Sequence, residues 1–420
     1  MSSAHIIGGH NTKFGALVKK NKETKEVTDL YSIYDLMREA ITGAVEDAQI
    51  DPGEVDGVWV GSFTPGLLTD QDHLGPYALE AFPEALRFKP TQRLEGACAS
   101  SSMAVYNALY AVESGRAKVA LVVGVEKMNL RSTKENTHAL ATASYWPTEG
   151  AEGMTFPGLF AEYAKGYQAH YGLDSHEFRR MLAATAALNY TNALDNDRAH
   201  FTKGGPPERL GLFSADAIMD LPEEKNPLIA DPLRLHDCSL ITDGAAALVI
   251  AADDVVTARS QPAVRIAGIG HTAERLALKD RENMHELIAA KRAVATAYGE
   301  AGITAADIDV AEVHDCFTIN HLLCTEAMGF SADGRAGYDY LAGRFTRDDE
   351  QLAINLSGGL KAKGHPVGAT GASMHVLLYK QLVEDPIGAA PSTKSPEVAA
   401  LLNVGGSAAT NAVSVLTRST

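Results

Sequence analysis

Two distant stretches of the chain share one pattern, and this repeat limits the folds that the chain can adopt. Residues 34–63 and 285–317 each begin with apolar residues at helical spacing, pass through a short turn, and end in a strand rich in β-branched residues that closes on Phe. The matching positions are Ile50 with Ile303 and Asp56 with Asp309. Such self-similarity predicts two related α/β halves.

A second pair of stretches supports the repeat. Residues 93–110 and 354–379 both run from a strand end through a turn of small residues into a helix. We therefore expect an N-terminal half over residues 1–260 and a C-terminal half over 261–420. The N-terminal half includes an inserted loop region, 129–235, which we expect to shape the ligand pocket, because insertions on an α/β scaffold commonly carry function.

A single cysteine marks the first of the two helix starts. Cys98 stands in the sequence EGACASSS, among alanines, serines and a glycine, just before an amphipathic helical pattern. A helix N-terminus lowers the pKa of a thiol, and small neighbours let an acyl group approach. The pattern predicts a nucleophile; the alternative is a buried, inert cysteine.

Two further stretches offer groups that could assist such a nucleophile. His365 lies in the loop before the second helix start, between Gly364 and Pro366, and is a candidate base. His314 and Cys316 stand at a predicted strand end in the sequence EVHDCF, where they could supply an oxyanion donor and an acid/base. The alternative for EVHDCF is a packed strand end without a chemical role.

Two His-x-Cys pairs raise a zinc alternative. They are His236 with Cys238 and His314 with Cys316. This spacing is uncommon for zinc ligands, so we predict no metal site. Residues 236–238 have the same His-Asp-Cys sequence as EVHDCF but lack the following Phe and helix, and we expect this pair to be structural.

Composition narrows the classes of function. The chain has 53 acidic and 37 basic residues, a formal net charge of −16, which argues against a general nucleic-acid or anionic-membrane surface. Four cysteines in 420 residues are too few for a disulfide framework and indicate a reducing compartment. We find no secretory signal and no apolar run of about 18 residues, so no membrane contact is expected and the cytoplasm is the predicted location.

Several motifs together resemble one protein family. GACASSS at residues 96–102, HDCF at 314–317, the glycine-rich NLSGGLKAKGHPVGATG at 355–371 and LNVGGSAATN at 402–411 occur in the order and at the approximate spacing of the thiolase family. They are most similar to its sterol-carrier-protein-2 type branch. The resemblance covers nearly the whole chain. It implies a five-layer αβαβα fold of two similar α/β halves, each with a five-stranded mixed sheet, related by pseudo-two-fold symmetry.

The resemblance also implies an activity and residue roles. Members make or cleave a carbon–carbon bond between coenzyme A thioesters, a Claisen condensation or its reverse, through an acyl-cysteine intermediate. Cys98 would carry the acyl group and His365 would take its proton. His314 and His365 would stabilise an enolate, Cys316 would move the α-proton, and the backbone N–H groups of Cys98 and Gly405 would form an oxyanion hole. Coenzyme A thioesters are then substrates, no bound cofactor is implied, and the residues that contact coenzyme A stay unassigned.

The chain departs from the best-known thiolases at one place. Where they carry a catalytic cysteine in a C-x-G motif, this chain has Asn403-Val404-Gly405, so Cys316 is the expected acid/base. Alternatives left open are a C-acyltransferase on a non-coenzyme A acceptor, such as an aromatic ring, and a thiolase-fold retro-aldol lyase working with a small OB-fold, zinc-containing partner. The family further implies a homodimer or homotetramer.

Overall fold

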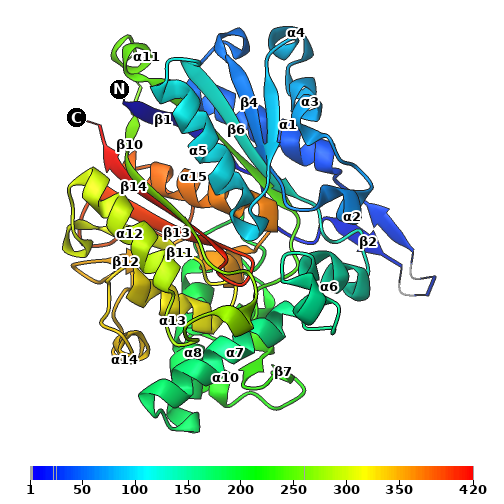
Figure 1. Cartoon of the computed structure of the whole chain (residues 1–420), viewed down its shortest axis with the longest axis vertical. Helices are drawn as coiled ribbons and strands as arrows, with labels where there is room; N and C mark the ends of the chain where they lie inside the picture. Colours follow the sequence, from blue (N-terminus) through cyan, green and yellow to red (C-terminus); the bar gives the residue numbers. More distant parts are fainter. Residues whose placement is uncertain (1–2, 22, 25, 260, 420) are drawn as a thin grey trace.

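The computed structural model describes residues 3–21, 23–24, 26–259 and 261–419. Its main feature is a sheet of ten strands made of two matching halves (Figure 1). From the middle outward, the first half contains β1 (Ala4–Asn11), β9 (Gly244–Ala252), β6 (Val119–Glu126), β4 (Gly57–Gly61) and β5 (Thr91–Leu94). The second contains β10 (Val264–Ala273), β14 (Thr410–Arg418), β13 (Val398–Gly405), β11 (Val310–Val313) and β12 (Ala353–Ile354).

The two half-sheets have the same topology. In chain order within each half, the first strand pairs antiparallel with the fifth, the fifth pairs antiparallel with the fourth, and the fourth, second and third strands are parallel neighbours. The halves meet where β1 pairs antiparallel with β10, with His5 opposite Arg265 and Ile6 opposite Val264. This equivalence confirms the prediction of two similar halves from the sequence repeat.

Helices complete the five layers. In the middle layer, α5 (Ser100–Glu113) and α15 (Thr370–Leu382) pack against each other and between the half-sheets. On the outer faces lie α1 (Ile33–Ala48) and α12 (Ile288–Ala301), with α13 (Thr318–Ala327) beside α12. These pairs are the helices of the two predicted repeats, so the αβαβα fold is confirmed.

The local sequence of α1 explains where this helix begins, which face it buries and where it ends. Helix α1 begins at Ser32, whose hydroxyl accepts from the Asp35 backbone while the Asp35 carboxylate accepts from the Ser32 backbone. This reciprocal capping satisfies two N–H groups that a helix start leaves free. Apolar residues then recur on one face, where Leu36 and Ala40 are fully buried against the sheet. The helix ends at Gln49 in the left-handed conformation.

The inserted region forms a helical layer over the second half. Its helices are α6 (Thr133–Ala141), α7 (Phe156–Tyr171), α8 (Ser175–Ala193), α9 (Pro206–Leu210) and α10 (Ala215–Met219), with a small hairpin of β7 (Leu228–Ala230) and β8 (Leu233–Arg234). Helices α7 and α8 share a core with α12 and α13. The insertion branches from the first half of the chain. Its helices α7 and α8 pack on the second half, whereas α6 contacts α2 (Pro65–Thr69) of the first half.

The remaining elements lie around this framework. A second hairpin pairs β2 (Val18–Lys20) with β3 (Val27–Asp29). Short helices are α2 (Pro65–Thr69), α3 (Leu74–Tyr77), α4 (Pro83–Leu86), α11 (Asp253–Thr257) and α14 (Ala336–Leu341). No helix among the described residues is both long and apolar enough to span a membrane.

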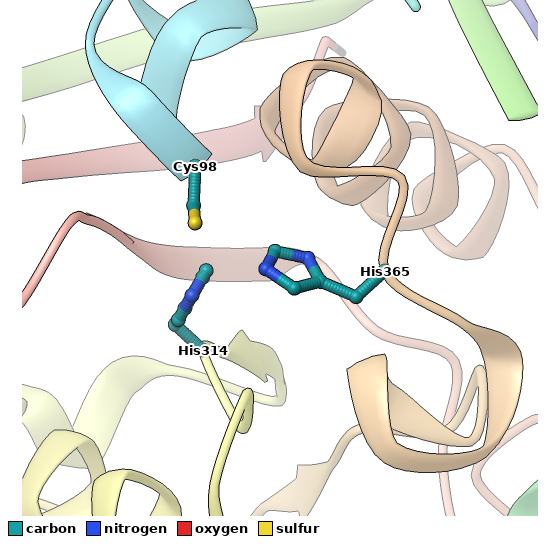
Figure 2. A group of neighbouring side chains, drawn as sticks. All are labelled: Cys98, His314 and His365. Carbon is teal, nitrogen blue, oxygen red and sulfur yellow. The ribbon is translucent and has the colours of Figure 1, made fainter. Parts of the chain in front are cut away.

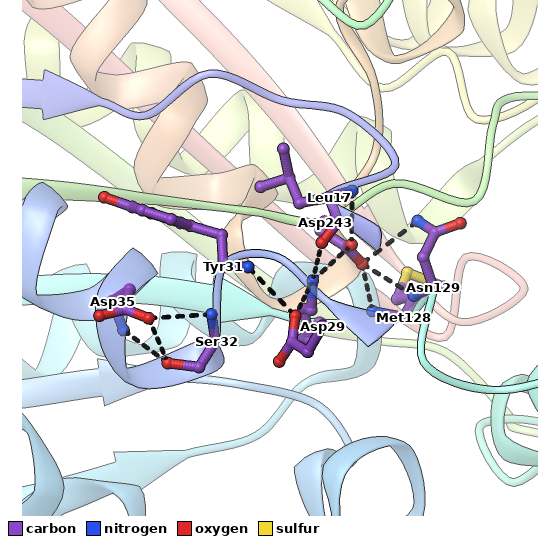
Figure 3. Close-up of polar contacts among 9 residues, drawn as sticks. Leu17, Asp29, Tyr31, Ser32, Asp35, Met128, Asn129 and Asp243 are labelled. Atoms are coloured by element: carbon purple, nitrogen blue, oxygen red, sulfur yellow. Dashed lines mark hydrogen bonds and ion pairs between the residues drawn. The ribbon is translucent and has the colours of Figure 1, made fainter. Parts of the chain in front are cut away.

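A buried aspartate holds the two ends of the insertion together (Figure 3). The Asp243 carboxylate accepts from the backbone N–H groups of Met128 and Asn129 at 2.7 and 2.8 Å, where the insertion starts, and itself stands just before β9. It also pairs with the fully buried Lys127 ammonium at 2.9 Å, which reaches Asp29 at 3.0 Å. The insertion is thereby fixed at its root, and the hairpin that carries Asp29 is attached to the same point.

We propose that the halves divide near residue 260, as expected from the sequence. Residue 260 itself lies outside the described residues. The last strand of the first half ends at Ala252, α11 follows, and the first strand of the second half begins at Val264.

Candidate active site

Three catalytic candidates converge where the two halves meet (Figure 2). Cys98 lies in a 3₁₀ turn, Ala97–Ala99, directly before α5. His314 follows the end of β11, and His365 stands in the loop before α15. The Cys98 sulfur and one ring nitrogen of each histidine lie within 4.8 Å of one another, and all three residues are buried. The structure thus brings Cys98 together with His365, which is more than 260 positions away in the chain.

A strained turn presents the cysteine. Ala97 has φ +50°, in the left-handed region that non-glycine residues seldom adopt. Such a residue costs about 1–3 kcal/mol and persists only where its surroundings enforce it. Here the Glu95 carboxylate accepts from the Ala97 backbone N–H at 2.5 Å, and the Ser100 hydroxyl donates to the Ala97 carbonyl at 2.6 Å. The chain therefore stabilises a sharp turn immediately before the thiol.

The expected lowering of the thiol pKa is wrong for the protein without substrate. Burial raises the pKa of Cys98 to about 12, and the Glu126 carboxylate adds to this rise, while a hydrogen bond from the Gly406 backbone opposes it. The helix start lowers the pKa of the thiol only through nearby partial charges. Burial raises the pKa by removing the water that would solvate the full charge of a thiolate, and this effect is the larger one. The resting nucleophile is therefore a neutral thiol that must lose its proton during attack.

His365 is held in the form that accepts this proton. Its Nδ1 lies 2.7 Å from the Thr370 hydroxyl oxygen, and that hydroxyl donates its own hydrogen to the Pro366 carbonyl at 3.1 Å. Because the hydroxyl has one hydrogen, Nδ1 of His365 is the donor of the first bond. Burial, together with the Lys363 ammonium, lowers the pKa of His365 to about 3. The ring is neutral, with an unprotonated Nε2.

His314 stands edge-on to His365, with ring centroids 5.1 Å apart and planes at 84°. Burial, His365 and Lys363 hold the pKa of His314 well below its usual value, so this ring is also neutral. Its Nδ1 lies 3.0 Å from Nδ2 of Asn403, and its Nε2 is buried with no hydrogen-bond partner among the described residues. Asn403 stands out in the sequence as a departure from the family, but the sequence assigns it no role.

Cys316 faces the same cavity as Cys98. Its thiol is 5 % exposed, and burial raises its pKa well above the usual value, with the nearby Cys98 adding to the rise. The intervening Asp315 points elsewhere: its carboxylate accepts from the backbone N–H groups of Leu360 and Lys361 at 2.7 and 2.9 Å. Asp315 thereby ties the HDCF segment to the loop that carries His365.

The two glycines after Asn403 have different surroundings. Gly405 closes β13, and a side chain there would lie 2.1 Å from the Gly96 carbonyl oxygen, so its backbone packs against the turn before Cys98. Gly406 has φ +62°, lines the cavity, and directs its backbone N–H at the Cys98 sulfur. Both glycines stand in the LNVGGSAATN motif, where the family resemblance implies Gly405 as a donor and the sequence gives no signal for Gly406.

A small, mainly apolar cavity of about 60 Å³ adjoins these residues. Cys98, Cys316 and His365 line it, whereas His314 is fully buried and is not among the lining residues. The other lining residues are Phe63, Ala97, Leu140, Ala143, Phe156, Ser239, Phe317, Val367 and Gly406. Three of these, at positions 140, 143 and 156, come from the insertion, which agrees with its expected part in shaping the pocket.

The second His-x-Cys pair has structural contacts. The Asp237 carboxylate accepts from the Thr318 hydroxyl at 2.9 Å, at the start of α13, and pairs with Arg179. His236 Nδ1 lies 2.7 Å from the Tyr190 hydroxyl oxygen, and Cys238 is absent from the cavity lining. The metal-ligating residue types that converge are instead Cys98, His314 and His365.

Two α/β halves of one topology, with a buried cysteine and two histidines where they meet, define a thiolase-like protein. A family model for the thiolase N-terminal domain matches residues 4–254, and one described as thiolase C-terminal domain-like matches residues 270–418. The chain belongs to the thiolase family. The acetyl-CoA acetyltransferase of Methanothermobacter thermautotrophicus is 34 % identical over 418 residues, covering 100 % of both chains.

Other relatives place the chain near the predicted branch. Sterol carrier protein 2 of Rattus norvegicus is 28 % identical over 360 residues, 83 % of this chain and 61 % of that protein. Among solved structures, the Ltp2-ChsH2(DUF35) aldolase matches with a TM-score of 0.78 and 19 % identity, over 99 % of this chain and 98 % of the other. Human mitochondrial 3-ketoacyl-CoA thiolase in complex with CoA matches with a TM-score of 0.70 and 16 % identity, over 100 % and 98 %. At these identities the structures support the fold alone.

Proposed function

We propose that the protein is a coenzyme A-dependent thiolase that converts a 3-ketoacyl-CoA and CoA into an acyl-CoA and acetyl-CoA, or catalyses the reverse. The observation that carries the proposal is the convergence of a neutral Cys98 thiol with a neutral His365 ring, whose Nε2 is unprotonated, beside a mainly apolar cavity. Membership of the thiolase family and the relative named acetyl-CoA acetyltransferase support the same activity.

Cleavage begins at the nucleophile. The Cys98 sulfur attacks the 3-keto carbon while His365 Nε2 takes its proton, so no thiolate has to exist beforehand. The carbon–carbon bond then breaks, leaving an acyl group on Cys98 and the enolate of acetyl-CoA. We assign stabilisation of the enolate oxygen to Nε2–H of His314 and to the newly protonated Nε2 of His365.

Cys316 completes the proton transfers. Its raised pKa keeps it a neutral thiol, which is the form needed to protonate the enolate carbon and release acetyl-CoA. The resulting Cys316 thiolate takes the proton of incoming CoA, and the CoA sulfur attacks the acyl group on Cys98. Cys98 leaves as a thiolate and recovers its proton from His365. In the condensation direction the same steps run in reverse.

Backbone N–H groups around Cys98 are proposed to stabilise the tetrahedral acyl-transfer intermediate. The family resemblance implies this role for Cys98 and Gly405. The Gly406 backbone N–H lies on the cavity side and is directed at the sulfur, so we add it to the proposed donors. Removing one such donor from other enzymes lowers kcat by about 100- to 1,000-fold, and backbone donors cost no reorganisation during reaction.

The cavity favours a short acyl group. About 60 Å³ is far below the roughly 300–1,000 Å³ of pockets that hold larger ligands, and aromatic side chains close it. Acetyl transfer between coenzyme A thioesters is therefore the preferred form of the activity. The test is to assay purified protein with CoA and 3-ketoacyl-CoAs of increasing length. Mass spectrometry of the trapped intermediate should place the acyl group on Cys98; absence of an acyl-enzyme with every substrate would overturn the proposal.

Assembly and location are proposed on the family resemblance. We propose a homodimer or homotetramer in the cytoplasm, with coenzyme A thioesters as the ligands. The aldolase with a DUF35 component among the matching folds makes a small OB-fold, zinc-containing partner worth testing. Co-purification of such a protein, followed by an assay with and without it, would distinguish an independent thiolase from one that needs a partner.

A further inference from the structure

Asn403 joins two of the three catalytic segments through one side chain. It lies on β13 and is fully buried. Its Oδ1 accepts from the Ser102 hydroxyl of α5 at 2.8 Å. Its Nδ2 lies 3.2 Å from the Cys98 carbonyl oxygen and 3.0 Å from Nδ1 of His314. The amide therefore contacts the nucleophile turn and the HDCF segment at once.

These contacts fix the orientation of the amide. The Cys98 carbonyl oxygen can only accept a hydrogen bond, so the atom facing it must be the amide nitrogen. The Ser102 hydroxyl donates to the remaining Oδ1. One hydrogen of Nδ2 serves the Cys98 carbonyl, and the other points to His314. Exchanging the amide oxygen and nitrogen would set two acceptors against each other.

The orientation of Asn403 decides which nitrogen of His314 carries the proton. Since Asn403 donates, Nδ1 of His314 must accept and has no hydrogen of its own. A neutral imidazole has one N–H, which is then on Nε2. That atom is buried and has no partner among the described residues, so it is an N–H group available to a ligand.

The adjacent histidine is held in the opposite form. Thr370 fixes the hydrogen of His365 on Nδ1 and leaves Nε2 as an acceptor. Two neighbouring rings of one residue type therefore enter the reaction with different capacities, one to take a proton and the other to donate a hydrogen bond. The difference arises because Nδ1 of His314 faces the amide of Asn403, whereas Nδ1 of His365 faces the hydroxyl of Thr370.

We propose that Asn403 is a positioning residue that holds His314 as the Nε2–H tautomer, so that this ring donates a hydrogen bond to the substrate oxygen while His365 acts as the base. The nature of that oxygen, a thioester enolate, rests on the proposed thiolase function. The tautomer itself does not, and it can be measured without turnover. In a family where a cysteine commonly occupies this place, asparagine would thus contribute through His314 rather than by moving a proton.

The first test uses the wild-type protein. The full chain, labelled with ¹⁵N-histidine, is examined by NMR, and the His314 signals are assigned by their loss in His314→Gln. We expect a protonated Nε2 and an unprotonated Nδ1 for His314. A protonated Nδ1 on His314 would overturn the proposal, whatever the activity of the enzyme.

The second test removes the hydrogen-bond donor of the Asn403 side chain. Asn403→Asp replaces a donor by an acceptor of nearly the same shape, so the proton of His314 should move to Nδ1. We expect exchange of the α-protons of acetyl-CoA with deuterated solvent to fall about 100-fold, as for loss of one oxyanion donor, and acylation of Cys98 to fall much less. Asn411→Asp is the matched control, because Asn411 lies on the adjacent β14 and its side chain bonds only the Ala408 carbonyl among the described residues.

The outcomes separate the two proposals. An unchanged tautomer and exchange rate in Asn403→Asp would refute the positioning role. If wild-type His314 shows the expected tautomer but no 3-ketoacyl-CoA is cleaved and no acyl-Cys98 forms, the thiolase proposal fails and the positioning role stands. Should Asn403→Asp fail to fold, the wild-type spectrum alone decides.

Discussion

The Thr370 hydroxyl oxygen lies 2.7 Å from Nδ1 of His365 and accepts a hydrogen bond from it, because the hydroxyl hydrogen is used by the Pro366 carbonyl. His365 stands in the loop before α15, and Thr370 is the first residue of that helix. The contact keeps Nε2 of His365 unprotonated and fixes the ring plane. His365 can accept the proton of the Cys98 thiol only if its Nε2 is unprotonated and its ring is correctly oriented, so the base depends on both effects.

Thr370→Val should lower the rate of Cys98 acylation by about 10- to 100-fold, as is typical when the partner of a functional histidine is removed. Thr370→Ser keeps the hydroxyl and should restore most of the rate. Burst formation of acyl-enzyme from acetyl-CoA measures the effect. Thr185→Val is the control, because its buried hydroxyl also donates to a carbonyl but lies in α8, outside the cavity lining. Equal losses in Thr370→Val and Thr185→Val would contradict the orienting role.

The rate of acylation should be nearly independent of pH between about 6 and 9. The reaction needs unprotonated His365 and a protonated Cys98 thiol. The pKa of His365 is lowered to about 3, so the base becomes active as pH rises through that value, far below this range. The pKa of Cys98 is raised to about 12, so the thiol keeps its proton throughout.

An ordinary histidine base, with a pKa of about 6.5, would instead lose most of its activity between pH 7 and 5.5. Stopped-flow acylation across this range distinguishes the two profiles. Burial raises the pKa of the nearby Glu126 to about 7, and its ionisation disfavours a thiolate at Cys98. Any shallow fall above pH 7 should therefore disappear in Glu126→Gln.

Much of the fold and the main site residues could be predicted from the sequence. The repeat located the paired helices and strands because each half buries the same apolar pattern, and the resemblance gave the layer order. Cys98 and His365 each stand in a short glycine-rich or small-residue motif, and His314 and Cys316 stand in the short HDCF motif. Such motifs are local, so a single sequence shows them directly.

The contacts that tune these residues could not be predicted. Asn403 meets His314 across 89 residues and Ser102 across 301, and no local pattern reports such pairs. The pKa of Cys98 was predicted in the wrong direction because the helix start is visible in the sequence, whereas burial depends on packing around the thiol. The sequence also gives no signal that the Gly406 backbone N–H is directed at the Cys98 sulfur, because this depends on how the turn after β13 packs against the turn that carries Cys98.

Cys316→Ala should form the acyl-enzyme from acetyl-CoA yet lose exchange of the α-protons of acetyl-CoA with deuterated solvent, by about 100- to 10,000-fold as for a general acid/base. The thiol faces the cavity beside Cys98 but is not needed for attack by Cys98. Cys324→Ala is the control: Cys324 is fully buried, and its thiol donates to the His314 carbonyl at 3.8 Å. Wild-type exchange in Cys316→Ala would reopen the search for the base.

His365→Ala and His314→Ala should separate the two half-reactions. Without His365 nothing takes the proton of a thiol whose pKa is about 12, so acylation of Cys98 should fall by about 100-fold or more. Without His314 acylation should persist, while α-proton exchange falls. Intact-protein mass spectrometry after rapid quenching gives the acylation rate. Equal loss of acylation in both variants would show that the roles are not divided between the two rings.

Phe156→Ala should widen the range of acyl chains that the enzyme accepts. Phe156 stands at the start of α7, in the insertion, and closes one side of a cavity of about 60 Å³. Removing the ring makes room for additional methylene groups, each worth roughly 1–3 kcal/mol in discrimination. We expect kcat/KM for 3-ketohexanoyl-CoA, relative to acetoacetyl-CoA, to rise by about tenfold or more. Phe213→Ala alters an exposed aromatic residue of the same insertion, outside the cavity lining, and should leave the ratio unchanged. If the ratio stays constant in Phe156→Ala as well, the acyl group does not occupy this cavity.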